Sequence, residues 1–228
     1  MAAGSGSRLR PLTDDYAKPV LPIDGRPVLA TLLRELASAR IRRVAVISGH
    51  HAAQVERVAG DGSAFGLEVV VVPQPSPDGS ADAVRRALDA GFDPPVLVTA
   101  ADTVYSPGDV GRFLEAWAAS SADGAIAGRR LPGPAPPHRF GLRVEGGHVT
   151  RVFDEDPANG LAAAPLWVLG PQAASRLCLD DPPWELGNAF QRAIDDGTPV
   201  AGVEIGPTRD LTRPIDLIRE NFTYLRGL

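Results

Sequence analysis

The stretch RVAVIS at residues 43–48 is an almost continuous apolar run, and LEVVVV at 67–72 and PVLVT at 95–99 repeat the pattern. Runs of this kind are typical of parallel strands that are covered on both faces. Residues 27–41, in front of the first run, place apolar side chains at the 3.6-residue spacing of one helix face. The alternation predicts an α/β fold with a Rossmann-like, mixed and mostly parallel sheet that is flanked by helices.

The pattern changes in the second half of the chain. The stretch FGLRVEGGHVTRVF at 140–153 alternates apolar and polar residues around a Gly-Gly pair at 146–147, which predicts a β-hairpin. No internal repeat and no linker is visible in the sequence. We therefore expect residues 1–228 to form a single domain with two halves, residues 1–125 and residues 126–228, the second of which contains the hairpin.

Composition narrows the class of partner. The formal net charge is −5, which disfavours binding to nucleic acid or to an anionic membrane surface. No stretch approaches the ~18 consecutive apolar residues of a membrane span, and the start has no apolar signal-peptide core. Cys178 is the single cysteine, so an internal disulfide is excluded and a reducing compartment suits the chain. We expect a cytoplasmic protein with no nucleic-acid partner and no membrane partner.

The first 22 residues, MAAGSGSRLRPLTDDYAKPVLP, follow neither a helix pattern nor a strand pattern. They contain a run of small residues that lets successive backbone N–H groups point toward one anion: Ala2, Ala3, Gly4, Ser5 and Gly6. Arg8 adds a planar guanidinium that matches phosphate oxygens, and Lys18 adds a mobile ammonium group. The segment therefore predicts a loop that binds a polyphosphate.

The motifs do not support two other kinds of site. A Walker-type phosphate loop needs a Gly-Lys-Ser/Thr ending that this segment lacks, and the dinucleotide-binding motif needs a glycine where Leu9 stands. His50 and His51 follow the apolar run at 43–48 and suggest a metal site. Because no further Cys or His accompanies them, we interpret the two histidines as part of a polar loop.

Several motifs together resemble a known family. The stretches AAGSGSRLRPLT at 2–13 and AKPVLPIDGRPVL at 17–29 resemble the signature of the sugar-1-phosphate nucleotidyltransferases, or nucleotide-sugar pyrophosphorylases. QPSPDG at 74–79 looks like the base-reading segment of the glucose-1-phosphate thymidylyltransferases, which lie close to the uridylyltransferases. AAD at 100–102 and RDLTRPIDLIREN at 209–221 continue the resemblance, so it covers nearly the whole chain in the right order.

The resemblance implies the GT-A-like nucleotidyltransferase fold, with a nucleotide-binding half at 1–125 and an acceptor-binding half at 126–228. It also implies an enzyme that transfers a nucleoside monophosphate from an NTP to a sugar 1-phosphate, with release of pyrophosphate and formation of an NDP-sugar. The attacking phosphate oxygen is already anionic, so no general base is needed. Catalysis then depends on charge neutralisation, to which Mg²⁺ would contribute, and on in-line positioning.

The charged residues of these motifs receive roles from the resemblance. Asp102 and Asp210 each follow an apolar run and are the expected Mg²⁺ ligands, since Mg²⁺ takes one or two carboxylates together with water. Arg8 is expected to hold the β- and γ-phosphates, and Lys18 the α-phosphate. The expected catalytic set is therefore Arg8, Lys18 and Asp102.

The nucleotide is expected to contact small and polar residues on two segments: Ala3, Gly4, Ser5, Gly6, Gln74, Gly79 and Ser80. Gln74 carries both a donor and an acceptor, which suits the imide edge of uracil or thymine and favours UTP or dTTP. Gly79 would let the base approach the backbone closely. An alternative for Ser80 is that it serves only as the N-cap of the helix that follows it.

The sequence departs from the family at its start. Members of the family carry a short apolar strand before Ala-Ala-Gly, whereas only Met1 precedes it here. We therefore expect the first strand to be truncated. Our hypothesis is that native residues precede Met1.

The second departure lies on the acceptor side. Many members place Glu-Lys-Pro after the hairpin, but here residues 154–157 read DEDP, so that Asp156 stands where the lysine is usual. Glu155 is expected to contact a sugar hydroxyl, and Arg139, Arg143 or Arg151 would replace the lost charge.

This departure leaves other functions open beside the sugar-1-phosphate nucleotidyltransferase. One is a cytidylyl- or guanylyltransferase that acts on a non-sugar phosphorylated or phosphonate acceptor. Another is a catalytically inactive subunit that senses a nucleotide and regulates a partner. The presence of Arg8, Lys18, Asp102 and Asp210 together argues against the second, because binding alone would tolerate the loss of a metal carboxylate.

Overall fold

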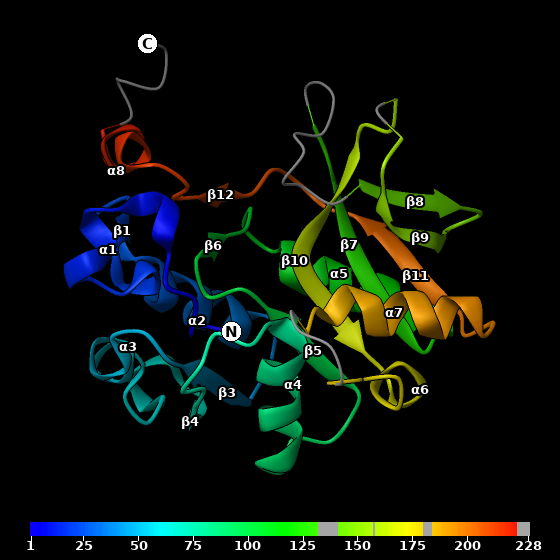
Figure 1. The fold of residues 1–228 in the computed structure, drawn as a ribbon, viewed down its shortest axis with the longest axis horizontal. Helices are drawn as coiled ribbons and strands as arrows, with labels where there is room; N and C mark the ends of the chain where they lie inside the picture. The colour runs from blue at the N-terminus through cyan, green and yellow to red at the C-terminus, as the bar shows by residue number, and fades with distance from the viewer. Residues whose placement is uncertain (132–140, 157, 180–183, 223–228) are drawn as a thin grey trace. The chain divides into compact units, whose positions relative to one another are not determined.

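The computed structural model describes residues 1–131, 141–156, 158–179 and 184–222 (Figure 1). The chain divides into two compact units, and each is built from segments that are not contiguous in sequence. Unit 1 contains Met1–Pro77, Ala100–Gly108 and Arg209–Leu228, and unit 2 contains Asp78–Thr99 and Asp109–Thr208. Among the described residues, each helix is too short or too polar to cross a lipid bilayer.

Unit 1 is built around a pair of parallel strands, β3 (Arg43–Ser48) and β4 (Glu68–Pro73). Two short pairs accompany it: β1 (Pro22–Ile23) with β2 (Arg26–Pro27), and β6 (Thr103–Val104) with β12 (Arg209–Asp210). Its α-helices are α1 (Leu12–Asp15), α2 (Val28–Ser38), α3 (Ala52–Ala59) and α8 (Pro214–Asn221). Three single turns of 3₁₀-helix complete it: η1 (Ser7–Leu9), η2 (Lys18–Val20) and η3 (Ser63–Phe65).

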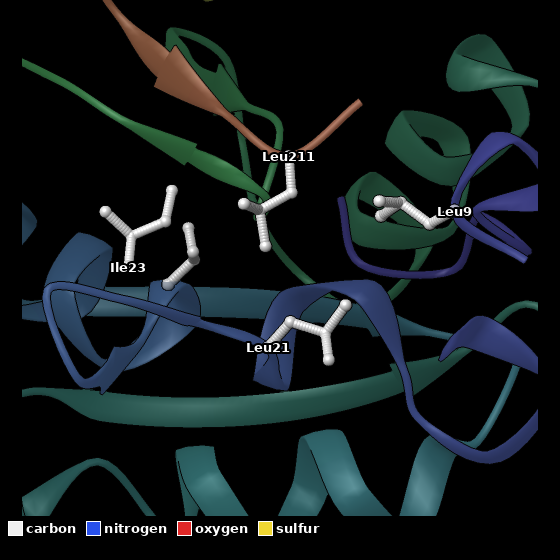
Figure 2. Close-up of a cluster of buried hydrophobic side chains, with 5 residues drawn as sticks. Leu9, Leu21, Ile23 and Leu211 are labelled. Atoms are coloured by element: carbon white, nitrogen blue, oxygen red, sulfur yellow. The ribbon is translucent and has the colours of Figure 1, made fainter. Parts of the chain in front are cut away.

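Helix α2 confirms the helix expected between residues 27 and 41. It starts directly after Pro27, and it buries an apolar stripe at helical spacing that includes Leu29, Leu33 and Leu36. Val28, its first residue, belongs to a buried cluster that gathers side chains from distant parts of the sequence (Figure 2). The members of this cluster are Leu9, Leu21, Ile23, Val28 and Leu211.

Unit 2 contains a six-stranded sheet in the order β5-β10-β7-β11-β9-β8. The strands are β5 (Val96–Thr99), β7 (Gly124–Arg130), β8 (Gly141–Glu145), β9 (His148–Asp154), β10 (Leu161–Leu169) and β11 (Val200–Glu204). Its helices are α4 (Ser80–Asp89), α5 (Asp109–Ser120), α6 (Pro171–Ala174) and α7 (Leu186–Asp195). Helix α5 packs against β7, β10 and β11, and α7 packs against β9 (Figure 1). Phe113 of α5 and Phe190 of α7 are completely buried in this core.

The mixed α/β fold and the hairpin are confirmed. Strands β8 and β9 pair antiparallel around Gly146 and Gly147, which have φ values of 57° and 82° that glycine adopts without strain. The expected predominance of parallel strands is wrong for the described residues. Strand β5 pairs antiparallel with β10, and the parallel strand pairs are β3–β4 and β7–β11. A continuous apolar run shows that both faces of a strand are buried, but it does not fix the direction of the neighbouring strand.

Candidate active site

The start of the chain docks against two other segments of unit 1. The N–H of Ala2 donates to the carbonyl of Ile47 at 2.7 Å, and Ala2 forms a parallel bridge with Ser48 at the end of β3. The carbonyl of Met1 accepts the N–H of Ala101 at 2.8 Å. Burial lowers the pKa of the terminal amine to about 6, although the nearby carboxylate of Asp102 acts in the opposite direction. Residues 1–3 therefore lie beside the predicted metal ligand Asp102.

The small-residue loop then turns back on itself at Gly6. Gly6 has a φ of 62°, and a Cβ at this position would lie 2.9 Å from Cγ2 of Thr13 and 3.3 Å from Cβ of Lys18. The hydroxyl of Thr13 donates to the carbonyl of Gly6 at 3.0 Å. The positive φ and the close approach favour glycine here, so the loop makes a tight turn two residues before Arg8. Thr13 was not among the predicted site residues, although its place in the PLT motif was a signal.

Arg8 lies on η1 between this turn and a hydrophobic anchor. Its side chain is exposed, whereas the next residue, Leu9, is 1% exposed within the cluster of Figure 2. Gly4 and Ser5 are exposed, and Ala3 is buried. The loop thus presents Gly4, Ser5 and the guanidinium of Arg8 to solvent, while Leu9 holds its backbone in place.

Lys18 and Asp102 form an ion pair. The ammonium of Lys18, at the start of η2, donates to Oδ2 of Asp102, and the two side chains are only 16% and 27% exposed. The structure therefore brings together two of the three residues that were predicted to be catalytic. Because an ammonium group has three donors, Lys18 can hold Asp102 and still donate to phosphate oxygens.

The pairing of β6 with β12 brings Asp210 close to Asp102. In this antiparallel pair Asp210 lies opposite Thr103, the neighbour of Asp102. The hydroxyl of Thr212 donates to Oδ1 of Asp210 at 2.8 Å, and Leu211 lies in the same cluster as Leu9 (Figure 2). Arg209, the first residue of β12, forms ion pairs with Asp24 and with Glu220 of α8, which hold the strand in place.

The donor set fits a magnesium ion that is shared with a phosphorylated ligand. Two carboxylates, Asp102 directly before β6 and Asp210 in the paired strand β12, match the one or two that Mg²⁺ usually takes from a protein. Among the described residues no group of three or more metal-binding side chains gathers at one point. The remaining ligands of the ion would therefore come from phosphate oxygens and water.

Gln74 lies next to the phosphate loop in unit 1. Its N–H donates to the carbonyl of Ser48 at 2.7 Å, and the residue is 4% exposed. A Cβ on Gly49 would lie 2.8 Å from the carbonyl oxygen of Gln74 and 2.9 Å from Cβ of Ala3. The structure thus places Gln74 and Ala3, two predicted nucleotide-binding residues, both close to Gly49.

Gly79 and Ser80 belong to unit 2 and have packing contacts there. Gly79 has a φ of 113°, and a Cβ on it would lie 2.3 Å from the carbonyl oxygen of Trp184. The hydroxyl of Ser80 donates to Glu185 at 2.7 Å and accepts the N–H of Leu186 at 2.8 Å. The alternative role of Ser80 as an N-cap is wrong, because Gly79 is the N-cap of α4 and Ser80 is its first residue. Nucleotide contact at these two positions stays a prediction.

Glu155 lines an open hollow of about 450 Å³ in unit 2, a size that suits a small-molecule ligand. Besides Glu155, the hollow is lined by Arg143, Arg151, Phe153, Asp154 and Asp156. Phe153 is the extra residue of a β-bulge in β9 and has a φ of 64°, an unusual conformation for a bulky side chain. Arg139, the other candidate cation, lies outside the described residues.

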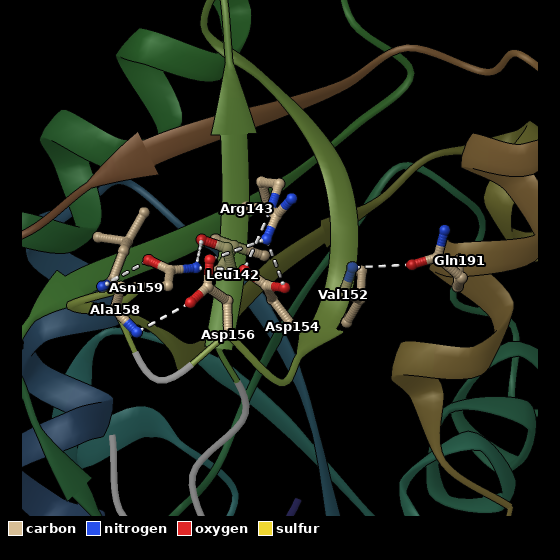
Figure 3. A network of polar contacts seen from close by, with 9 residues as sticks. Leu142, Arg143, Val152, Asp154, Asp156, Ala158, Asn159 and Gln191 are labelled. Carbon is tan, nitrogen blue, oxygen red and sulfur yellow. Dashed lines mark hydrogen bonds and ion pairs between the residues drawn. The ribbon is translucent and has the colours of Figure 1, made fainter. Parts of the chain in front are cut away.

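A polar network fixes one wall of this hollow (Figure 3). Arg143 donates to both carboxylate oxygens of Asp154, at 3.2 and 3.1 Å, and to Asp156 at 3.3 Å. Burial raises the pKa of Asp154, but hydrogen bonds from Asn159 and Arg143 and the charge of Arg143 outweigh it, so that the pKa is lowered. Arg151 lies opposite Arg143 in the β8–β9 pair. The charge of Arg143 is therefore shared with Asp154 and Asp156, and the described residues provide no such partner for Arg151.

Comparison with known proteins shows the family to which the chain is similar. The family model described as nucleotidyl transferase matches residues 1–178. The low-salt glycan biosynthesis nucleotidyltransferase Agl11 of Haloferax volcanii is 28% identical over 97% of this chain and 64% of its own length. A glucose-1-phosphate thymidylyltransferase of Streptomyces antibioticus is 29% identical over 100% of this chain and 66% of its own length. The chain thus spans about two thirds of the length of these relatives.

The solved structures support the fold independently. A putative glucose-1-phosphate thymidylyltransferase from Bacillus anthracis, solved in complex with a sucrose, superposes with a TM-score of 0.85 at 20% identity. The match covers 100% of this chain and 94% of the other. The expected nucleotidyltransferase fold is therefore confirmed.

Proposed function

Because this chain belongs to the nucleotidyl transferase family, we propose that it transfers a nucleoside monophosphate from an NTP to a sugar 1-phosphate, with release of pyrophosphate. The observation that carries the proposal is the grouping in unit 1 of the Gly6 loop, the Lys18–Asp102 ion pair and Asp210 opposite Thr103. The name of the Streptomyces antibioticus relative, a glucose-1-phosphate thymidylyltransferase, supports a sugar 1-phosphate as the acceptor class.

The reaction needs positive charge and correct placement rather than a base. An acceptor phosphate oxygen attacks the α-phosphorus of the NTP, the bond from that phosphorus to the bridging oxygen breaks, and pyrophosphate leaves. Lys18 donates to the α-phosphate, and Arg8 to the departing β- and γ-phosphates. Mg²⁺, when held by Asp102 and Asp210, supplies further positive charge against the phosphate oxygens.

The proposed identity of the NTP rests on Gln74. Its buried side chain carries a donor and an acceptor that suit a pyrimidine imide, so UTP and dTTP are the proposed donors. Residues 1–125 are proposed as the nucleotide-binding half and residues 126–228 as the acceptor-binding half.

Since the donor is an NTP, we propose the cytoplasm as the site of the reaction.

The acceptor half rests on the hollow beside Glu155. Arg143, which also pairs with Asp154, offsets part of the charge of Asp156, which otherwise would repel an acceptor phosphate. Arg151 then provides a cation, and Glu155 an acceptor for a sugar hydroxyl. The same Asp156 favours a second candidate, a cytidylyl- or guanylyltransferase with a non-sugar phosphorylated or phosphonate acceptor.

A pyrophosphate-release screen tests the proposal. ATP, GTP, CTP, UTP and dTTP are each combined with Mg²⁺ and one of several acceptors: hexose 1-phosphates, a phosphorylated polyol and a phosphonate. We expect release with UTP or dTTP and a hexose 1-phosphate, and loss of turnover in Asp102→Asn. Release with CTP or GTP and a non-sugar acceptor would favour the second candidate. If no pair reacts but a nucleotide raises the melting temperature, the protein is a nucleotide sensor instead.

A further inference from the structure

The single-turn helix α1 ends in three consecutive carbonyl groups that are bonded by side chains from another segment. The carbonyl of Thr13 is bonded by Nε2 of His50 at 2.9 Å, and that of Asp14 by Nε2 of His51 at 3.0 Å. The carbonyl of Asp15 accepts Nε2 of Gln54 at 2.7 Å. Carbonyls in the last turn of a helix have no partner within the helix, so these side chains satisfy groups that the backbone leaves open.

Gln54 binds the segment at two points. Its Nε2 donates to Asp15, and its Oε1 accepts the N–H of Ala17 at 2.9 Å. The side-chain amide therefore bridges the residues on either side of Tyr16. Ala17 is 1% exposed and directly precedes Lys18, so this bridge lies one residue away from the ion pair with Asp102.

His50 contacts the loop at two positions, once through its ring and once through its backbone. Its ring contacts the carbonyl of Thr13, while its backbone N–H donates to the carbonyl of Ala3 at 3.4 Å. Thr13 in turn donates its hydroxyl to Gly6. A short chain of hydrogen bonds thus runs from the end of β3 through His50 and Thr13 to the glycine turn that precedes Arg8.

The chemistry of the acceptors fixes the role of the two rings. A carbonyl oxygen can only accept, so each histidine donates through an Nε2–H group. The two ring centroids lie 4.0 Å apart, so each ring also limits the orientation of the other. The two histidines therefore hold the loop through its backbone carbonyls. This gives a role to two residues that were interpreted from the sequence only as part of a polar loop.

We infer that His50, His51 and Gln54 are positioning residues that hold residues 3–18 in the conformation that binds polyphosphate. The inference rests on the proposed function, because it assigns the polyphosphate of the NTP to this loop. Without the side-chain donors, the loop would populate open conformations, and the apparent affinity for polyphosphate would be the affinity of the closed loop multiplied by the fraction of molecules in which the loop is closed. One hydrogen bond between neutral groups corresponds to about a fivefold change, which is about 1 kcal/mol.

The sequence offers a direct measure of loop opening. Arg10, Lys18 and Arg26 all precede proline, where trypsin does not cut, so Arg8–Leu9 is the one tryptic site in the first 26 residues. Cleavage there requires the buried Leu9 to leave its cluster. The next site, Arg34–Glu35, lies within α2 and reports wider unfolding of unit 1. The ratio of the two cleavage rates separates loop opening from loss of the fold.

The variants are His50→Leu, Gln54→Glu, His50→Gln and the control His148→Leu. His148 is an exposed hairpin residue of unit 2. We expect His50→Leu and Gln54→Glu to raise cleavage at Arg8 about fivefold at an unchanged rate at Arg34, and to weaken binding of Mg²⁺-pyrophosphate by at most the same factor. His50→Gln keeps an N–H donor and should restore most of both values, whereas His148→Leu should alter neither.

Pyrophosphate is the probe because it does not depend on the base. The inference would be overturned if trypsin cut His50→Leu and the wild type at Arg8 at equal rates. It would also be overturned if the cleavage rate of His50→Leu rose equally at Arg8 and Arg34 and His50→Gln failed to restore the wild-type rates. If the variants open the loop as expected but the wild type binds neither pyrophosphate nor any NTP, the proposed function fails and the hydrogen-bonded support of the loop stands.

Discussion

Replacement of Leu211 by alanine tests whether one hydrophobic cluster holds in place the two segments that carry Arg8 and Asp210. Leu211 is 1% exposed and follows Asp210, and Leu9 in the same cluster follows Arg8 (Figure 2). The change removes three carbon atoms, which corresponds to about 2.4 kcal/mol of lost transfer free energy. With the cavity that remains, we expect the free energy of unfolding to fall by about 3 kcal/mol. For a chain of this size the melting temperature should fall by roughly 6–12 °C.

The effect on activity separates this reasoning from a general loss of stability. A shift of about 1 Å in a charged group can lower turnover by about 100-fold, so we expect kcat/KM to fall at least tenfold in Leu211→Ala. The matched control is Leu169→Ala in β10 of unit 2, where the leucine is 0% exposed and pairs with Val96, at the end of β5 opposite to Thr99. Both variants are assayed well below their melting temperatures, with urea unfolding for stability and pyrophosphate release for activity. If the two lose equal stability and equal activity, the cluster does not position the site.

Three further predictions concern other residues. Lys18→Ala should lower turnover by more than about 100-fold, as the loss of a strong oxyanion donor does, and a mild effect in steady-state kinetics would exclude Lys18 from catalysis. The folded-state pKa of Asp154 lies below its ordinary value of 3.8, so its carboxylate stabilises the fold above that pH and loses this effect as the pH falls through the folded pKa. The difference in unfolding free energy between the wild type and Asp154→Asn should therefore narrow between pH 7 and pH 3, and an unchanged difference would contradict the ion-pair argument. Gly79→Ala should lower the free energy of unfolding by at least about 2 kcal/mol, because it adds a clash with Trp184 to an unfavourable φ. Gly91→Ala, with a φ of 82° and open space around it, is the control and should cost less in urea titrations.

Local patterns in the sequence predicted those elements whose signal is contained within a few residues. The stripe of α2 and the Gly-Gly turn between β8 and β9 are of this kind, and both are confirmed. The direction of β5 was not predictable in this way, since it depends on β10, more than sixty residues later. Periodicity reports which faces are buried and says nothing of which distant strand lies alongside.

The candidate site shows the same limit. The motifs identified Lys18, Asp102 and Asp210 separately, and the structure adds that the first two form an ion pair and that Asp210 lies opposite Thr103. His50 was interpreted as part of a polar loop because a metal site needs several ligands, and the sequence shows no further Cys or His that accompanies His50 and His51. Its bond to the carbonyl of Thr13 has no sequence signal, since every residue offers a backbone carbonyl and only the fold selects one.

The interleaving of the two units has a consequence for synthesis on the ribosome. Unit 2 ends at Thr208, and the last segment of unit 1 begins at Arg209, so the nascent chain releases all of unit 2 before β12 emerges. Domains often fold in order from the amino end during translation, but here the unit that starts first is finished last. The segment that carries Asp210 is thus the final part to be added. A chain that stops at residue 208 would contain every residue of unit 2, but its unit 1 would lack Asp210, the second proposed metal ligand.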